Sequence, residues 1–190
     1  QHLALFEQGV RFQRSLTAVV SDVCRMAALV PTDSGTHSVV ATAVSLEDLQ
    51  GLFHEVSPQE GALVWYWSGH GKVAHKKSSP PHLMLCLAEQ DSKAAQSTQG
   101  AKEVPVPLAQ VVRMLPPQAT PVLVILECCH AGAAADLLQH RPHTMLLAAC
   151  SPLEMSGSWI MDGTDSGGIM TQFLTDPVAA YFKVQWNVFF

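Results

Sequence analysis

The stretch Val122-Leu-Val-Ile-Leu-Glu-Cys-Cys-His-Ala-Gly132 changes abruptly from branched apolar residues to an acid, two thiols, an imidazole and a glycine. Its apolar half predicts a strand that is covered on both faces, as is usual for a central strand of a parallel sheet. The residues after such a strand lie at its carboxyl end, where open α/β sheets place their ligands. We therefore expect Glu127, Cys129 and their neighbours to form a functional site.

Helices and strands alternate along the rest of the chain. Apolar residues at three- and four-residue spacing predict a helix over residues 10–30, and Ser45 followed by Asp48 predicts the start of another that runs to residue 55. Further helices are expected over 106–115, over 131–140 and from 169. Strands are expected at 2–6, 38–44, 62–67, 82–88, 122–126, 144–150 and 179–190. Loops are expected at 72–81, 89–103 and 151–168.

This alternation predicts one α/β domain over residues 1–190, a three-layer α/β/α sandwich with a mainly parallel sheet. The 190 residues, 48% of them hydrophobic, are enough for a sizeable core. A net charge of −5 and a pI near 5.9 argue against nucleic acid or a membrane surface as partner. No apolar run approaches the roughly 18 to 20 residues that span a bilayer.

The five cysteines are odd in number and lack the spacing of a disulfide framework. This usage predicts a reducing, cytoplasmic compartment. The chain begins at Gln1 rather than Met, which we interpret as a fragment of a longer protein. Flanking domains or an activating partner outside the fragment are therefore left open.

A second motif, Tyr66-Trp-Ser-Gly-His-Gly71, also ends an apolar run. His70 and Cys129 are thus both expected at carboxyl ends of strands, where they can be neighbours in space. An imidazole can accept the proton of a thiol whose pKa is about 8.5, and can later protonate a leaving amine. Backbone N–H groups of Cys129 and Gly71 are expected to stabilise an oxyanion. The pattern predicts acyl transfer by a cysteine, most simply peptide hydrolysis.

Glu127 and Cys129 are two residues apart and should point to the same face of the strand end, whereas Cys128 should point away and be structural. A carboxylate beside the nucleophile would pair with a basic substrate group, which predicts cleavage after Arg or Lys. A zinc site formed by the two cysteines with His130 is disfavoured, because vicinal cysteines cannot easily both reach one tetrahedral ion. His130 is interpreted as a helix-start residue.

The two motifs resemble the paired histidine and cysteine motifs of the caspase-like cysteine peptidases, most of all the metacaspases. That branch reads Tyr-Ser-Gly-His-Gly and Asp-x-Cys-His-Ser-Gly, where this chain has Tyr66-Trp-Ser-Gly-His-Gly71 and Leu126-Glu-Cys-Cys-His-Ala-Gly132. The resemblance implies a caspase-hemoglobinase fold with His70 and Cys129 as the catalytic dyad. Caspases proper carry Gln-Ala-Cys-Arg-Gly and cleave after Asp, a specificity that Glu127 argues against.

A weaker similarity concerns the segment Ser21-Asp-Val-Cys-Arg-Met26, which resembles an Asn-Asp-Ala segment in the family's first helix. It implies that Asp22 lines the pocket for the basic residue; the alternative is that Asp22 lies on a solvated helix face. Glu127 stands where the family usually has Asp. Many family members bind calcium through aspartates, for which Asp162 and Asp165 are the candidates here.

Two functions remain open. The first is a cysteine endopeptidase that acts on peptides or proteins, and the intact His70 and Cys129 favour it. The second is a caspase-like domain with weak or lost catalysis that serves as a regulatory or interaction module. The altered motif edges and the apolar tail 181–190, which would suit a partner surface, favour the second.

Overall fold

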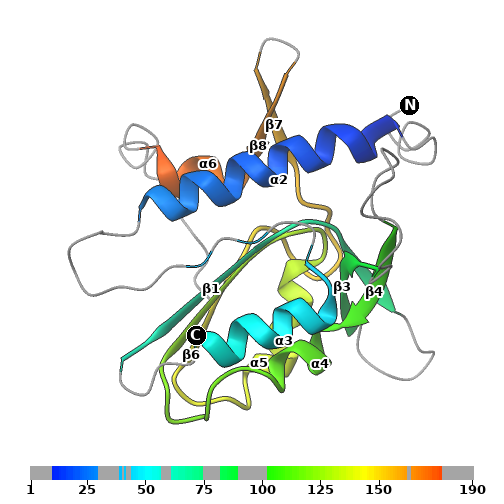
Figure 1. Ribbon diagram of the computed structural model, residues 1–190. Helices are drawn as coiled ribbons and strands as arrows, with labels where there is room; N and C mark the ends of the chain where they lie inside the picture. Colours follow the sequence, from blue (N-terminus) through cyan, green and yellow to red (C-terminus); the bar gives the residue numbers. More distant parts are fainter. Residues whose placement is uncertain are drawn as a thin grey trace.

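The computed structural model describes residues 10–29, 39, 41, 44–56, 61–74, 82–89, 102–161 and 164–176, and only the backbone of 10–18, 158–161 and 164–166. This part of the chain has an α/β fold (Figure 1). It contains a parallel sheet and an antiparallel sheet of three strands each, and a two-stranded hairpin. The expected α/β class with a parallel sheet is therefore confirmed.

The parallel sheet consists of β1 (Leu63–Ser68), β5 (Val122–Glu127) and β6 (Thr144–Ala148), in that order. β5 is the central strand and is buried at every position except Leu123, as the continuous apolar run predicts. A strand that is hydrogen-bonded on both edges and covered by side chains on its faces has little access to water, so only apolar residues suit its interior.

The two faces of this sheet are buried to different extents. On one face the side chains join the hydrophobic core: Leu63, Trp65, Val122, Val124 and Leu126. On the other face Val64, Leu123 and Met145 lie in one row of the register, and the outer two are 60% and 52% exposed. The prediction of a buried strand over 144–150 is therefore wrong in its burial, since β6 is a half-exposed edge strand within the described sheet.

The antiparallel sheet has the order β2 (Gly71–Ala74), β3 (His82–Ala88), β4 (Glu103–Pro107). β3 was predicted, whereas β2 replaces the beginning of the loop expected at 72–81. β4 takes the last residue of the loop expected at 89–103 and the first two residues of the helix expected over 106–115, so that helix begins only at Leu108. The two prolines of β4 made the segment look unlike a strand in the sequence, because proline cannot donate a hydrogen bond to a neighbouring strand. It is tolerated here since β4 is an edge strand in the described sheet.

The described helices are close to the predicted ones. They are α2 (Val10–Ala28), α3 (Leu46–Glu55), α4 (Leu108–Val112), the 3-10 turn η2 (Ala131–Ala134), α5 (Ala135–Leu138) and α6 (Ile169–Thr175). α3 begins as its sequence predicts, because Ser45 Oγ accepts the Asp48 N–H and the Asp48 carboxylate accepts the Ser45 N–H, which forms a capping box. No helix among the described residues has the length and apolarity needed to cross a membrane.

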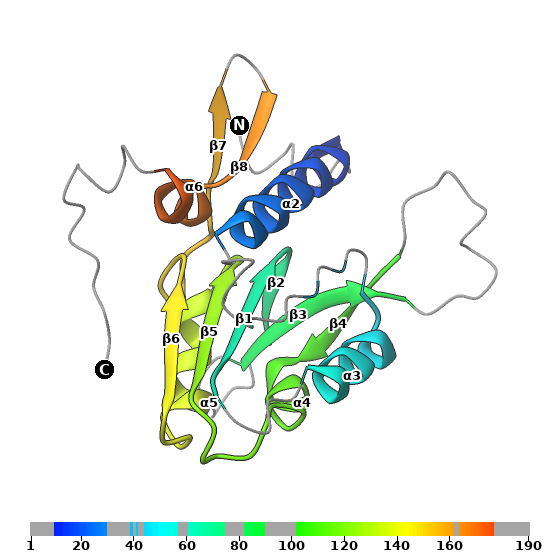
Figure 2. The ribbon, with the colours of Figure 1, turned by 60° about the vertical axis from the view of Figure 1, so that its left-hand side comes forward.

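Figures 1 and 2 show α2 and α6 next to each other beyond the carboxyl ends of the parallel strands. The helices α3, α4 and α5 lie on the opposite side, toward the amino ends of those strands. On that side Phe53 of α3 packs edge-on against Trp65, with ring centroids 5.5 Å apart. The polar strand ends therefore face α2 and α6 instead of open solvent.

A hairpin of β7 (Ser158–Met161) and β8 (Thr164–Gly168) occupies part of the expected loop 151–168, so that prediction is wrong there. The sequence did carry a signal, because Asp-Gly between two strands is a strong hairpin pattern. The strands expected at 2–6 and 179–190 lie outside the described residues. So does the strand expected at 38–44, except for residues 39, 41 and 44, of which Val44 accepts the Ala88 N–H beside β3.

Candidate active site at the carboxyl ends of β1 and β5

The carboxyl ends of β1 and β5 lie side by side, because Ser68 is paired with Glu127 in the parallel register. The pairing continues past the strands, where the Gly69 N–H donates to the Glu127 carbonyl over 3.2 Å. His70 and Cys129 each follow two residues after a strand end, at matching places in the two segments. The structure therefore brings the two predicted dyad residues to the same edge of the sheet.

Gly71 brings the two segments into direct backbone contact. A Cβ at this position would lie 2.2 Å from Cys129 O and 3.0 Å from Cys128 Sγ. Only glycine allows the chains to approach this closely, because any side chain would overlap the carbonyl. The backbone of Gly71 is thus beside that of Cys129, as an oxyanion-binding role requires, and the role itself stays a prediction.

The two vicinal thiols have different environments. Cys128 is 1% exposed, which fits its interpretation as a structural residue, whereas Cys129 is half-buried. Burial raises the pKa of both thiols above the ordinary value of 9.0, and that of Cys128 well above it. For Cys129, the backbone N–H groups of Ser156 and of Cys129 itself oppose the increase in pKa. Cys129 in this state needs a base to become a thiolate at neutral pH.

The imidazole of His70 is held by an acid that sequence analysis missed. His70 Nδ1 lies 2.9 Å from Oε1 of Glu103, and the two side chains are 21% and 17% exposed. The antiparallel sheet explains the contact. On one edge of β3 the His70 carbonyl accepts a hydrogen bond from the Cys86 N–H, and on the other edge Glu103 of β4 is paired with Ala88. All four side chains lie on one face of the sheet. Glu103 was missed because it was assigned to a loop.

Glu127 is 4% exposed, and both oxygens of its carboxylate accept hydrogen bonds from the same chain. Its Oε2 accepts the Thr171 N–H at 2.7 Å and the Thr171 hydroxyl at 3.0 Å, and its Oε1 accepts the Ser156 hydroxyl at 3.0 Å. Burial raises the pKa of Glu127, these hydrogen bonds lower it, and the nearby charge of Asp22 adds to the increase. Glu127 thus anchors the beginning of α6 to the end of β5.

Asp22 is 1% exposed, so the alternative of a solvated helix face is wrong. Its carboxylate accepts the Gly168 N–H at 2.9 and 3.0 Å and the Ser68 hydroxyl at 2.9 Å. The residue thereby connects α2 to the end of β1 and to the junction of β8 and α6. The structure brings Asp22 and Glu127 to the same end of the sheet, and the role of Asp22 in a substrate pocket stays a prediction.

Gly167 and Gly168 pack directly on these two carboxylates. A Cβ at Gly167 would lie 2.2 Å from Asp22 Oδ1, and one at Gly168 would lie 2.3 Å from Glu127 Cδ. Gly167 also has a φ of 119°, a conformation that disfavours other residues. Both acids therefore face β8 and α6, and a substrate side chain reaches them only if the segment 167–171 moves.

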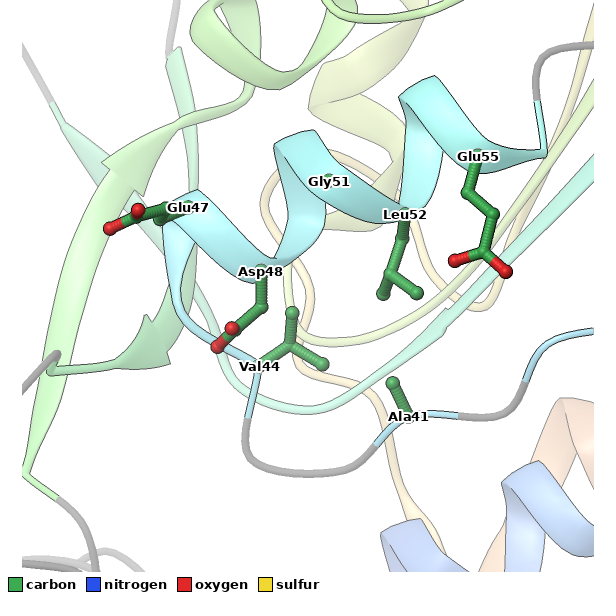
Figure 3. A pocket seen from close by; sticks show the side chains of 7 residues that line it. All are labelled: Ala41, Val44, Glu47, Asp48, Gly51, Leu52 and Glu55. Carbon is green, nitrogen blue, oxygen red and sulfur yellow. The ribbon is translucent and has the colours of Figure 1, made fainter.

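A hollow of about 460 Å³ lies beside α3 and is lined by Ala41, Val44, Glu47, Asp48, Gly51, Leu52 and Glu55. Figure 3 shows Glu47 and Glu55 at the two ends of the helix, with the apolar side chains of Val44 and Leu52 between them. None of the predicted site residues lines this hollow. It holds neither a nucleophile nor a histidine, and we assign it no chemistry.

Calcium and zinc are the two metal ions that the sequence raises for this chain. Among the described residues, no group of three or more histidine, cysteine or acidic side chains could hold a metal ion. The calcium candidate Asp162 lies outside those residues, and only the backbone of Asp165 is described. His130 precedes η2 with a φ of 62° and its Nδ1 lies 3.1 Å from Pro152 O, which agrees with a helix-start residue. Calcium binding stays a prediction for which no ligand set is described.

Comparisons with known proteins do not assign a family. Neither a scan against protein-family models nor searches of the curated proteins and of the solved structures found a match. The residues at the carboxyl ends of β1 and β5 are therefore the basis for a functional assignment.

Proposed function

We propose that this chain is a cysteine endopeptidase whose nucleophile is Cys129 and whose acid–base group is His70. One observation carries the proposal: the parallel pairing of β1 with β5 places both residues two positions past adjoining strand ends, with Gly71 packed on the Cys129 backbone. Both reactive groups lie at the carboxyl edge of a parallel sheet, which is where the catalytic residues of α/β enzymes commonly lie.

The reaction follows from these groups. Cys129 Sγ loses its proton to His70 and attacks the carbonyl carbon of the peptide, and the oxyanion is stabilised by the backbone N–H groups of Cys129 and Gly71. The imidazolium returns the proton to the amine, which leaves, so that a thioester remains. Water then attacks the thioester with His70 as base, which releases the acid and regenerates the thiol. Because burial raises the pKa of Cys129, the imidazole is essential at neutral pH.

We extend the proposal to the three-layer caspase-hemoglobinase fold and to a reducing, cytoplasmic location. The parallel order β1–β5–β6, with the histidine after one strand and the cysteine after the next, supports the fold. The location is supported by the cysteines, all five of which are described and are free thiols.

The proposed substrate has Arg or Lys before the cleaved bond. Asp22 and Glu127 support this preference, because their carboxylates lie at the paired carboxyl ends of β1 and β5, and the nucleophile follows β5. A basic side chain would replace the internal hydrogen bonds of these carboxylates by ion pairs. Binding would require Gly168 and Thr171 to withdraw, so we expect turnover to depend on the mobility of the β8–α6 junction.

A regulatory or interaction module remains the second candidate. The observation in its favour is that the carboxylates of Glu127 and Asp22 already accept hydrogen bonds from donors of the same chain. In such a protein the acids serve to tie α6 and β8 to the sheet, and no basic side chain ever replaces these donors. The predicted partner would be a protein surface instead of a cleavable peptide.

A reporter panel tests the proposal. Short peptides with Arg, Lys, Asp or Leu before the scissile bond are incubated with the chain, with and without calcium, and turnover is compared with that of Cys129→Ala and His70→Ala. Cys150→Ala is the matched control, because Cys150 is a half-buried thiol after the neighbouring strand β6 and has no proposed role in catalysis.

Turnover of the Arg and Lys reporters that disappears in Cys129→Ala and His70→Ala, and survives in Cys150→Ala, would support the peptidase. The calcium arm would show whether the ion is needed. Absence of turnover from folded protein under both conditions would contradict the peptidase and favour the regulatory module. Equal turnover of the Asp and Arg reporters would contradict only the acidic pocket.

A further inference from the structure

Glu103 reaches across a whole strand to contact the imidazole of His70. The two residues lie on opposite edges of β3, and the Cys86 side chain lies between them on the same face. Glu103 is also close to the Cys86 thiol. Burial, and after it the negative charge of Glu103, raises the pKa of this thiol to about 11. The carboxylate and the imidazole nevertheless meet at 2.9 Å, a normal hydrogen-bond length.

The contact determines which ring nitrogen carries the proton. An ionised carboxylate has no hydrogen to donate, so His70 Nδ1 must be the donor in this bond. A neutral imidazole that carries its proton on Nδ1 presents a basic Nε2, and it is Nε2 that would exchange the proton with Cys129. The same bond limits the rotation of the ring about χ2 and so defines the direction of Nε2.

A purely structural role explains the geometry of Glu103 poorly. Its second oxygen, Oε2, is buried and accepts no hydrogen bond from an N–H or O–H group of the described residues. A buried oxygen of this kind lowers stability, and in native proteins such groups call for an explanation. If His70 becomes an imidazolium during a reaction, the negative charge of the Glu103 carboxylate would stabilise it through an ion pair.

We propose that Glu103 is the positioning residue of the site, which holds the His70 ring so that Nδ1 is protonated and Nε2 faces the nucleophile in a Cys129–His70–Glu103 arrangement. The proposal rests on the proposed peptidase function and adds a third residue to the dyad. Glu103 does not touch the substrate in this arrangement, because it acts through the imidazole.

The first readout is the tautomer of His70, which is independent of turnover. Nitrogen-15 NMR of the imidazoles is recorded for the wild-type chain, for Glu103→Ala and for Glu103→Gln, and the His70 signals are identified by their loss in His70→Gln. We expect the Nδ1–H tautomer in the wild type and the Nε2–H tautomer in Glu103→Ala. Glu103→Gln keeps the size and one acceptor oxygen, and should retain a larger fraction of the wild-type tautomer.

The second readout is steady-state kinetics with the best reporter of the panel. Glu103→Ala should lower kcat by about 100-fold and leave KM within about twofold, because the ring orientation matters for proton transfer and not for substrate binding. Glu103→Gln should recover part of the loss. The matched control is Glu89→Gln, which removes a carboxylate paired with Lys102 next to the same edge of β3 and β4 but on the surface; it should change neither quantity.

The NMR and kinetic results each test the role of Glu103. An unchanged His70 tautomer in Glu103→Ala would overturn the proposal, and so would a kcat within about twofold of the wild type while turnover still requires Cys129. A wild-type chain that cleaves no reporter would refute the peptidase. In that case the NMR result alone decides whether Glu103 orients the ring. Glu103→Gln keeps both tests available if the alanine variant does not fold.

Discussion

Replacement of Thr171 by valine tests whether the polar connections beneath α6 hold the candidate site together. Thr171 is fully buried, and its hydroxyl donates to Glu127 Oε2 over 3.0 Å. A hydroxyl has one hydrogen, so the contact of 2.6 Å between Thr171 Oγ1 and Tyr66 Oη must be donated by the tyrosine. The three residues thus form a chain of hydrogen bonds from β1 through α6 to β5.

Valine has nearly the shape of threonine but removes both bonds of the hydroxyl. The bond to a carboxylate is worth roughly 1.5 to 3 kcal/mol and the bond from a neutral phenol about 1 kcal/mol. We therefore expect Thr171→Val to lower the free energy of unfolding by about 3 kcal/mol. Thr171→Ser keeps the hydroxyl and loses one buried methyl group, for which about 1 kcal/mol is expected.

The assay is urea unfolding followed by circular dichroism, with the slope of the transition checked for each variant. If packing dominated, the serine variant would be the less stable of the two, and that order would refute the reasoning. A double-mutant cycle of Thr171→Val with Tyr66→Phe should give a coupling energy of about 1 kcal/mol, since each change removes the same bond. A coupling energy near zero would show that the 2.6 Å contact contributes nothing.

Three further predictions concern single residues. Burial raises the pKa of Glu127 above its ordinary 4.5, so its favourable contribution is present at acid pH and is lost as the pH rises through the folded-state pKa. Unfolding curves at several pH values should therefore show that the free energy of unfolding of Glu127→Gln rises relative to that of the wild type as the pH approaches neutrality. A difference in free energy that stays constant with pH would contradict this. Ser45→Ala should lower the melting temperature through the loss of about 1 kcal/mol from the cap of α3, and Ser45→Asn should restore most of it. Gly71→Ala should cost about 1 to 3 kcal/mol and abolish reporter turnover, because its Cβ would meet Cys129 O at 2.2 Å. Gly51→Ala, where a Cβ meets nothing within 4 Å, should leave turnover unchanged and stabilise α3 slightly.

Local pattern was enough to predict much of the fold. The apolar runs identified β1, β3 and β5, and the helical spacing identified α2 and α3 with the cap at Ser45. The polar motifs after β1 and β5 indicated that His70 and Cys129 would follow strands ending at the same edge of the sheet. These predictions succeeded because burial on a strand or on one helix face requires a periodic arrangement of apolar residues, which neighbouring positions reveal by themselves.

What the sequence by itself determined was therefore the strands of the parallel sheet, β3, the main helices and the edge of the sheet at which chemistry is expected. Only the tertiary structure decided which groups each site residue contacts. Glu103 is 33 residues from His70 in the chain, and Gly168 is 146 residues from Asp22. No local pattern encodes such pairs, because hydrogen bonds and burial between distant segments arise only when sheets and helices pack. The same packing exposed the edge strand β6 and enclosed the carboxylates of Asp22 and Glu127.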